Sequence, residues 1–135
     1  MASDSDREPA GTPAEAGTTV VITGAASELG RRVCARTLAD PDVARVVAID
    51  QRSLRRLPAG VERHQVDLAD ADLKPLFEGA AAVVHLAQAD GPAPGSTRRP
   101  AAGDELLTRR VLDAASAVGT AHLVVLSSAL SLIHI

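Results

Sequence analysis

Four short apolar runs, rich in valine, isoleucine and leucine, divide the chain into regular units. In the first, T-T-V-V-I-T at 18–23, apolar residues occupy successive positions, which indicates a strand that is buried on both faces. A more polar segment, V-E-R-H-Q-V, has the length of a short strand between two such runs. We therefore predict five strands, at residues 18–23, 43–50, 61–66, 81–87 and 122–128.

Helical spacing appears between these strands. Over residues 103–118, the apolar positions recur at steps of three or four, and Gly119 is placed to end the helix. A similar pattern predicts a helix over 27–38, and a short helix is predicted over 71–78, between a capping aspartate and Gly79. Because strands and helices alternate, we expect an α/β fold with a doubly wound parallel sheet, right-handed crossovers and the strand order 3-2-1-4-5.

The first strand runs directly into a glycine-bearing turn that reads T-G-x-x-S-x-x-G from Thr23 to Gly30. Glycine has no Cβ, and the start of a helix offers free N–H groups and the positive end of its dipole. Such a turn lets the backbone approach a phosphate group. Ser27 stands where it can cap the following helix. An ordinary tight turn is the alternative interpretation.

Several segments, taken in order, resemble the short-chain dehydrogenase/reductases. The closest branch is the extended one, the NAD-dependent epimerase/dehydratases. Ser27 replaces the middle glycine of that family's T-G-x-x-G-x-x-G motif, and Asp104 and Leu107 replace a usual asparagine and glycine. The matching segments are V-D-L-A-D at 66–70, V-V-H-L-A at 83–87, D-E-L-L-T-R-R-V-L-D-A-A at 104–115 and the strand ending in Ser-Ser at 127–128.

The resemblance implies a Rossmann-type fold that binds a dinucleotide across the carboxyl ends of its strands. Asp50 ends the second strand 20 residues after Gly30, where such folds place an acid against the adenosine ribose. This carboxylate favours NAD over NADP, whereas Arg52 could pair with a 2′-phosphate. The cofactor-binding residues that the resemblance implies are Gly24, Ser27, Glu28, Leu29, Gly30, Asp50, Arg52, Asp67, Leu68, Leu86, Ala87 and Gln88.

Asp67 and Asp70 have a competing structural interpretation, because either could cap the helix predicted over 71–78. We assign Asp70 to the cap and Asp67 to the adenine site. The histidines do not form a metal-ligating constellation, and His85 is interpreted as a packed, hydrogen-bonded residue within its strand. No metal site is therefore expected.

The resemblance also implies catalytic groups. Ser128 aligns with the serine that orients the substrate oxygen, with Ser127 beside it. Family members take up the substrate proton with a tyrosine in Y-x-x-x-K, but this chain has no tyrosine, and its one lysine is Lys74. We expect the cofactor half of an epimerase, dehydratase or reductase that acts on a hydroxyl or carbonyl substrate, for which a nucleotide sugar is one candidate. The 135 residues alone are expected to be inactive.

Two other classes of function stay open: a non-catalytic dinucleotide-binding regulatory module, and an α/β interaction domain without a cofactor. The formal net charge of −3 does not suggest nucleic acid or an anionic membrane as partner. Cys34 is the single cysteine, so the simplest setting is a reduced, cytoplasmic one. For the parent enzyme we expect a small-molecule substrate, and a homodimer is one assembly open to it.

The two ends of the chain differ from the rest. Residues 1–17 are rich in Ala, Pro, Gly, Ser and acidic residues, which predicts a disordered leader. Residues 18–129 form the expected, incomplete dinucleotide-binding domain. The codons CTG-TCT-CTT-ATA-CAC-ATC of a transposon-end adapter would encode residues 130–135. We therefore expect this tail to be non-native read-through, with a natural apolar C-terminus as the alternative.

Overall fold

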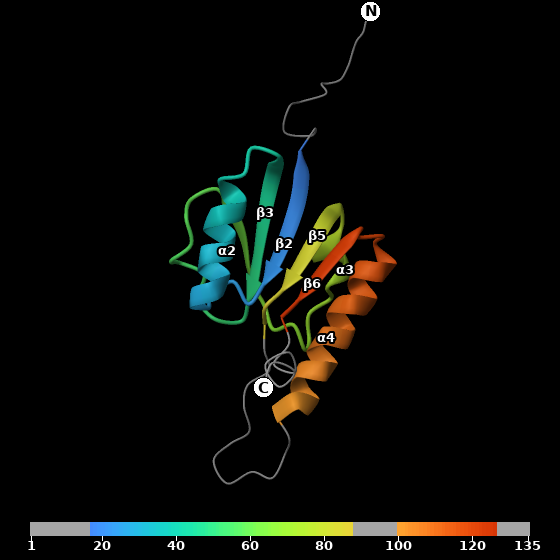
Figure 1. The fold of residues 1–135 in the computed structure, drawn as a ribbon. Coiled ribbons are helices and arrows are strands. Elements are labelled where there is room, and N and C mark those ends of the chain that lie inside the picture. Colours follow the sequence, from blue (N-terminus) through green and yellow to red (C-terminus); the bar gives the residue numbers. More distant parts are fainter. Residues whose placement is uncertain (1–16, 88–99, 127–135) are drawn as a thin grey trace, which may run out of the picture.

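The computed structural model of the protein describes residues 17–87 and 100–126, and it shows an open sheet flanked by helices (Figure 1). The strands are β2 (Thr18–Thr23), β3 (Val43–Asp50), β4 (Val61–Gln65), β5 (Ala80–His85) and β6 (His122–Val125). The helices are α2 (Glu28–Leu38), α3 (Lys74–Phe77) and α4 (Pro100–Ala117).

The five strands are parallel and lie in the order β4-β3-β2-β5-β6, which confirms the predicted order 3-2-1-4-5. From β2 the chain winds outward to β3 and β4, and it then returns to the other side of β2 for β5 and β6. Between β2 and β5 the direction of winding reverses. In open α/β sheets, ligands bind in the crevice at the carboxyl ends of the strands beside such a switch point.

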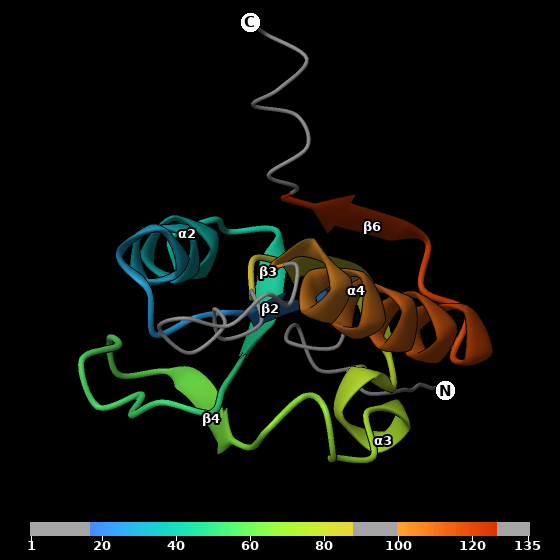
Figure 2. The same ribbon diagram turned by 90° about the horizontal axis from the view of Figure 1, so that it is seen from below.

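Helices cover both faces of the sheet, as Figure 2 shows. Neighbouring residues of β2 point to opposite faces, so Val21 and Ile22, both fully buried, belong to different hydrophobic clusters. Val21 packs in the cluster that includes Phe77 of α3 and Val111 of α4. Ile22 packs in the cluster that includes Cys34 of α2. The successive apolar residues of β2 are therefore explained by burial on two sides.

The predicted bounds of β2 and β3 agree with the structure, and the other strands differ at their ends. β4 stops one residue earlier than predicted, at Gln65. β5 begins at Ala80 and ends at His85, and the N–H groups of the next two residues donate to the Thr23 hydroxyl group. Residues 127 and 128, which the prediction included in the last strand, lie outside the described residues.

The helix predicted over 71–78 is wrong in its first half, because α3 is a single turn, Lys74–Phe77. Pro75 has no N–H, and in a helix begun at residue 71 its ring would clash with the carbonyl group of Ala71. The assignment of Asp70 as the cap is also wrong: Leu73 precedes α3 and makes no side-chain cap. Before α3, the chain forms a turn in which the Asp67 carbonyl accepts hydrogen bonds from two following N–H groups.

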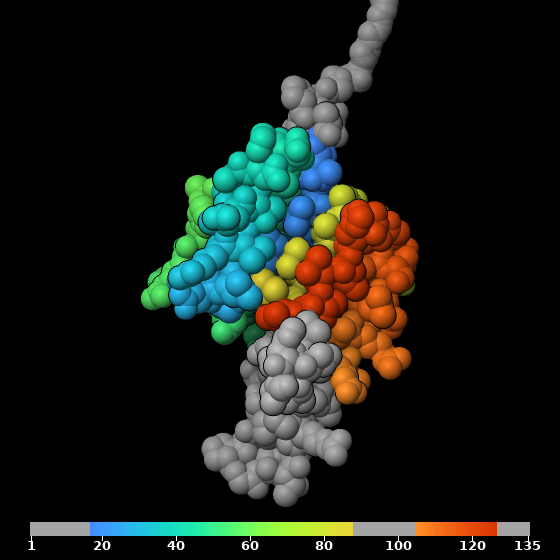
Figure 3. Space-filling view, viewed as in Figure 1, coloured from blue at the N-terminus to red at the C-terminus, as the bar shows by residue number. Residues whose placement is uncertain are grey.

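One half of a sheet face is not covered by any helix of residues 17–87 and 100–126. Helix α2 packs against β2 and β3, whereas Val124 of β6, which pairs with Val84 of β5 and shares its face, is 55% exposed. Leu126 is 44% exposed just beyond β6. Figure 3 shows atoms of β5 and β6 at the surface beside α2. No helix within the described ranges is long and apolar enough to cross a membrane.

Candidate functional site

The turn after β2 lies tightly against the end of β5. Gly24 has a positive φ of 70°, a conformation that favours glycine, and its N–H donates to the Ile49 carbonyl at 2.9 Å. A Cβ at Gly24 would approach the Ala87 nitrogen to 2.5 Å. The structure therefore brings the turn and Ala87, both predicted cofactor residues, into direct contact.

Ser27 caps helix α2, as the sequence predicted. Its Oγ donates to the Gly24 carbonyl at 2.8 Å and accepts a hydrogen bond from the Gly30 N–H at 2.9 Å. Gly30 is buried, and a Cβ there would collide with the Gly24 carbonyl oxygen. A serine in the middle position of the motif is thus compatible with the close approach of helix and turn.

The first turn of α2 carries N–H groups of the kind that can bind an anion. Helix geometry leaves the N–H groups of Glu28 and Leu29 without partners inside the helix. The Leu29 side chain is 46% exposed, and the exposed Glu28 carboxylate pairs with Arg32 at 3.0 Å. This ion pair partly offsets the negative charge that Glu28 would place near a bound phosphate group.

Asp50 links the end of β3 to the glycine-bearing turn. Its carboxylate is buried, and Oδ2 accepts a hydrogen bond from the Ala26 N–H at 2.9 Å. Oδ1 accepts from the Arg52 N–H at 2.9 Å. The Arg52 guanidinium completes the pair, with Nε 3.2 Å from Oδ1 and Nη2 3.1 Å from Oδ2. Asp50, Arg52 and the turn therefore form one connected group.

The ionisation of Asp50 follows from these contacts. Burial alone would raise the pKa of this carboxyl group. The hydrogen bonds from Arg52 and Ala26, together with the guanidinium charge, outweigh burial and hold its pKa below the ordinary value. Asp50 is consequently a carboxylate at neutral pH, the form that accepts hydrogen bonds from sugar hydroxyl groups.

A second set of hydrogen bonds joins β2 to the end of β5. The Thr23 hydroxyl accepts from the N–H groups of Leu86 and Ala87, at 3.1 and 3.2 Å. It also lies 2.7 Å from Nδ1 of His85, whose side chain is only 1% exposed. These contacts confirm that His85 is a packed, hydrogen-bonded residue, and they fix the backbone of two predicted cofactor residues.

Asp67 and Leu68 lie on the segment that follows β4, and this segment begins beside Asp50. The Val66 N–H donates to the Asp50 carbonyl at 3.0 Å. The exposed Asp67 carboxylate accepts a hydrogen bond from the Ala69 N–H at 2.9 Å, and the Leu68 side chain is buried. The Asp67 carboxylate therefore stabilises a local turn. In the prediction from sequence, Asp67 belongs to the adenine site and the capping role falls to Asp70 instead.

Most predicted cofactor residues thus gather at the carboxyl ends of β2, β3, β4 and β5. Gln88 and Ser128 lie outside the described residues, so their predicted roles remain predictions. Thr23 was not singled out in the sequence, although a hydroxyl group at the end of a buried strand is itself a signal for a tertiary hydrogen bond. Arg110 was also missed, because its partners are backbone carbonyl groups.

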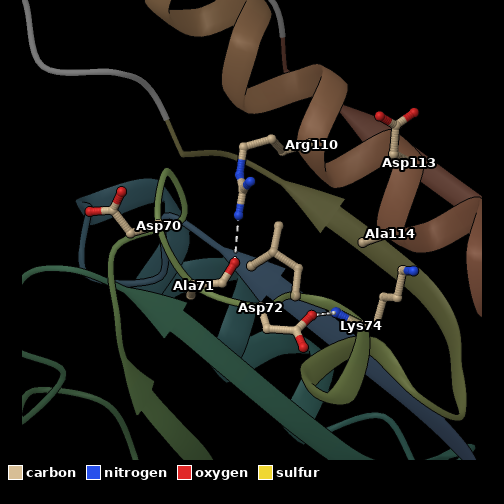
Figure 4. A pocket seen from close by; sticks show the side chains of 8 residues that line it. Asp70, Ala71, Asp72, Lys74, Arg110, Asp113 and Ala114 are labelled. Atoms are coloured by element: carbon tan, nitrogen blue, oxygen red, sulfur yellow. Dashed lines mark hydrogen bonds between the residues drawn. The ribbon is translucent and has the colours of Figure 1, made fainter.

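Other features of the described residues lie apart from this group. A pocket of about 380 Å³ lies between the segment before α3 and helix α4, and none of its lining residues is a predicted cofactor residue (Figure 4). Within residues 17–87 and 100–126, no group of three or more His, Cys, Asp and Glu side chains is placed to hold a metal ion.

Residues 20–131 match the family described as the NAD dependent epimerase/dehydratase family. A search of curated proteins finds no significant match. Among solved structures, uronate dehydrogenase from Agrobacterium tumefaciens is similar, with 29% identity and a TM-score of 0.66 over 84% of this chain and 41% of that one.

Two further solved structures are similar and carry ligands. A short-chain dehydrogenase/reductase superfamily protein from Agrobacterium tumefaciens with bound NAD shares 33% identity over 82% of this chain and 32% of that chain (TM-score 0.68). WbmG from Bordetella bronchiseptica, in complex with NAD and UDP, shares 26% identity over 81% of this chain and 37% of that chain (TM-score 0.65). The chain therefore spans well under half of each of these structures.

Proposed function

The chain belongs to the NAD-dependent epimerase/dehydratase family, and on that premise we propose that it forms the NAD-binding part of an enzyme that transfers hydride to or from a hydroxyl or carbonyl substrate. NAD, when bound, accepts or returns the hydride at its nicotinamide ring. The residues described here would hold the adenosine and pyrophosphate parts of the cofactor.

The observation that carries this proposal is the hydrogen bond between the Asp50 carboxylate and the Ala26 N–H. In adenosine diphosphate, the ribose hydroxyl groups and the pyrophosphate lie only a few bonds apart. Dinucleotide-binding folds of the Rossmann type place a carboxylate that binds the ribose close to the phosphate-binding turn. That hydrogen bond holds the two together, and Gly24 leaves the backbone of the turn without a side chain.

Each residue of the group has a stated role in this proposal. Gly24 and Gly30 allow the close approach of turn and helix, and the N–H groups at the start of α2 meet the pyrophosphate. Asp50 accepts hydrogen bonds from the adenosine ribose, and Asp67 and Leu68 border the adenine. Leu86, Ala87 and Gln88 would lie beneath the pyrophosphate and the nicotinamide ribose.

The proposal extends to the catalytic groups and to the class of substrate. We assign the substrate-orienting hydroxyl group to Ser128, with a tyrosine and lysine pair supplied from outside these 135 residues. The similarity to a uronate dehydrogenase and to an enzyme crystallised with NAD and UDP supports a sugar or nucleotide-sugar substrate. The chain by itself is then expected to bind NAD weakly, if at all, and to show no turnover.

The test is a titration of the full-length protein with NAD and with NADP. We expect NAD to bind more tightly, and Asp50→Asn to weaken NAD binding by about tenfold or more, because charge-assisted hydrogen bonds are lost. Asp42→Asn is the matched control, since Asp42 is exposed near the start of the same strand.

Three outcomes separate the proposal from its alternatives. NAD binding with turnover of a sugar substrate supports the enzyme. NAD binding by the full-length protein without any turnover would indicate a regulatory dinucleotide-binding module instead. If neither dinucleotide binds, the cofactor assignment is wrong and an interaction domain remains.

A further inference from the structure

The segment from Val66 to Leu73 connects β4 to α3 and has no regular secondary structure. Its fixed points are the turn around Asp67 and two buried side chains, Leu68 and Leu73, which are 5% and 3% exposed. An irregular segment of this kind needs further tertiary contacts to keep one conformation. Those contacts come from helix α4.

Arg110 reaches from α4 to this segment and binds two of its carbonyl groups. Its Nε donates to the Leu68 carbonyl at 2.8 Å, and its Nη2 donates to the Ala71 carbonyl at 2.5 Å. Figure 4 shows the side chain extending from the helix toward Ala71. Because the guanidinium group is planar and rigid, two bonds from it set the spacing and orientation of both carbonyl groups.

Two other charged side chains that line the pocket, Asp113 and Lys74, make no comparable contact. Asp113 follows Arg110 by one helical turn on α4, and Lys74 begins α3. Within the described residues, neither side chain makes a hydrogen bond or an ion pair; Lys74 contributes only its backbone N–H, at 3.4 Å from the Asp72 carboxylate. Of these three charged side chains, only that of Arg110 therefore joins helix α4 to the segment before α3.

We propose that Arg110 is a positioning residue for the adenine end of the cofactor site. It holds the Leu68 and Ala71 carbonyl groups, and with them the turn that carries Asp67 and Leu68, in the conformation that receives the adenine. This inference rests on the proposed function, because it takes these two residues as the adenine contacts. Without the guanidinium group, the segment must be ordered when the cofactor binds, and that cost weakens binding.

The experiment compares Arg110→Met with Arg109→Met in the full-length protein. Arg109 is the neighbouring arginine and is exposed, so its replacement removes the same charge and leaves the segment's contacts in place. The probes are AMP and nicotinamide mononucleotide, each titrated in competition with NAD. We expect Arg110→Met to weaken AMP and NAD binding about tenfold and to leave nicotinamide mononucleotide binding unchanged, whereas Arg109→Met changes none of the three.

A merely structural role would have a different signature. The inference would be overturned if Arg110→Met lost the same affinity for AMP and for nicotinamide mononucleotide, or if it lost no affinity for AMP. In either case, NAD binding by the wild type would still support the proposed function. If the wild type bound neither NAD nor AMP, both would fall. Arg110→Lys keeps a cation that can reach one carbonyl group, so we expect it to restore part of the AMP affinity. Should Arg110→Met fail to fold, an Arg110→Lys protein with wild-type AMP affinity would contradict the inference.

Discussion

At the scale of single residues, the contact between Asp50 and Arg52 governs how the adenosine site can work. A carboxylate offers about four acceptor positions. Arg52 occupies three through its N–H, Nε and Nη2, and the Ala26 N–H takes the fourth. Ribose hydroxyl groups must therefore compete with the Arg52 side chain for the carboxylate that is proposed to bind them.

We predict that Arg52→Ala tightens NAD binding by about threefold to tenfold, because the ion pair that it removes, in which the arginine side chain is exposed, is worth about 1 kcal/mol. The same change should weaken NADP binding. A carboxylate repels a phosphate by on the order of 1–4 kcal/mol at contact distance, and no cation at position 52 would then offset that repulsion. Titration of both cofactors measures the two effects, with Arg55→Ala as the control on the same connection. Weaker NAD binding by Arg52→Ala would contradict the competition.

A second prediction concerns the glycine-bearing turn. Gly24→Val should abolish NAD binding, because its side chain would enter the backbone of Leu86 and Ala87. Ser27→Gly should leave NAD binding unchanged or tighten it, since the cap bond is the main loss and a glycine cap costs only a few tenths of a kcal/mol. Calorimetric titration of each variant tests this. Wild-type affinity in Gly24→Val would remove the turn from the phosphate site.

The sequence anticipated some of these residues and could not anticipate others. Asp50 stands out because it ends an apolar strand at a fixed distance from a glycine motif. Its hydrogen-bond donor, the Ala26 N–H, could not be predicted from the sequence, because every residue except proline has a backbone N–H group. The contacts of Arg110 were equally unpredictable from the sequence. An arginine on a helix usually faces solvent, and only the fold shows that two backbone carbonyl groups lie within its reach.

At the scale of the elements, helix α2 offers an internal probe of folding. Cys34 is fully buried on its inner face, and burial raises the pKa of the thiol to about 11, although the charge of Arg63 acts to lower it. The thiolate is the reactive form, so two effects, low access and a high pKa, act in the same direction.

We predict that Cys34 resists an aromatic disulfide reagent at pH 8 in the folded protein and reacts fully once urea unfolds the chain. The absorbance of the released thiol product follows the reaction, and Cys34→Ala serves as the blank. Reaction at the rate of a free cysteine without denaturant would show that α2 opens readily and that the thiol is not a packing residue.

The elements were predicted unevenly, for physical reasons. β2 and β3 are rich in apolar residues that are buried on both faces of the sheet. For these two strands, the bounds predicted from the apolar residues agree with the observed ones. For α3, the polar and apolar spacing favoured a helix from residue 71, but Pro75 restricts helical structure to the single turn that begins at Lys74. The steric restriction at Pro75 thus shortens the helix that was predicted over residues 71–78 to one turn.

At the scale of the whole molecule, one half-face of the sheet is left without a covering helix among the described residues. Val124 and Leu126 are exposed on β6 and just beyond it, and in the part of the chain that the structure describes β6 is an edge strand of the sheet. Exposed apolar strands at a sheet edge promote pairing with other chains.

We therefore predict that the 135-residue chain, made by itself, self-associates at micromolar concentration. Light scattering after size-exclusion chromatography measures the mass. Val124→Lys should shift the distribution toward the monomer, because it places a charge on that half-face. Glu105→Lys changes charge at an exposed site on α4 and should not. A monodisperse wild-type monomer with a cooperative melting transition would show that the five-stranded unit needs no cover.

The central position of β2 also sets the order in which the fold can be assembled during synthesis. Among the described strands, β2 leaves the ribosome before the others, yet one of its two neighbours, β5, follows far along the chain: Thr23 and His85, which are joined by a hydrogen bond, are 62 residues apart. At about 5–20 residues per second, the ribosome needs roughly 3–12 s to make that length. For this interval β2 can pair with β3 alone, and its other edge, with the unsatisfied N–H and C=O groups of an apolar strand, is open to chaperones and to neighbouring nascent chains.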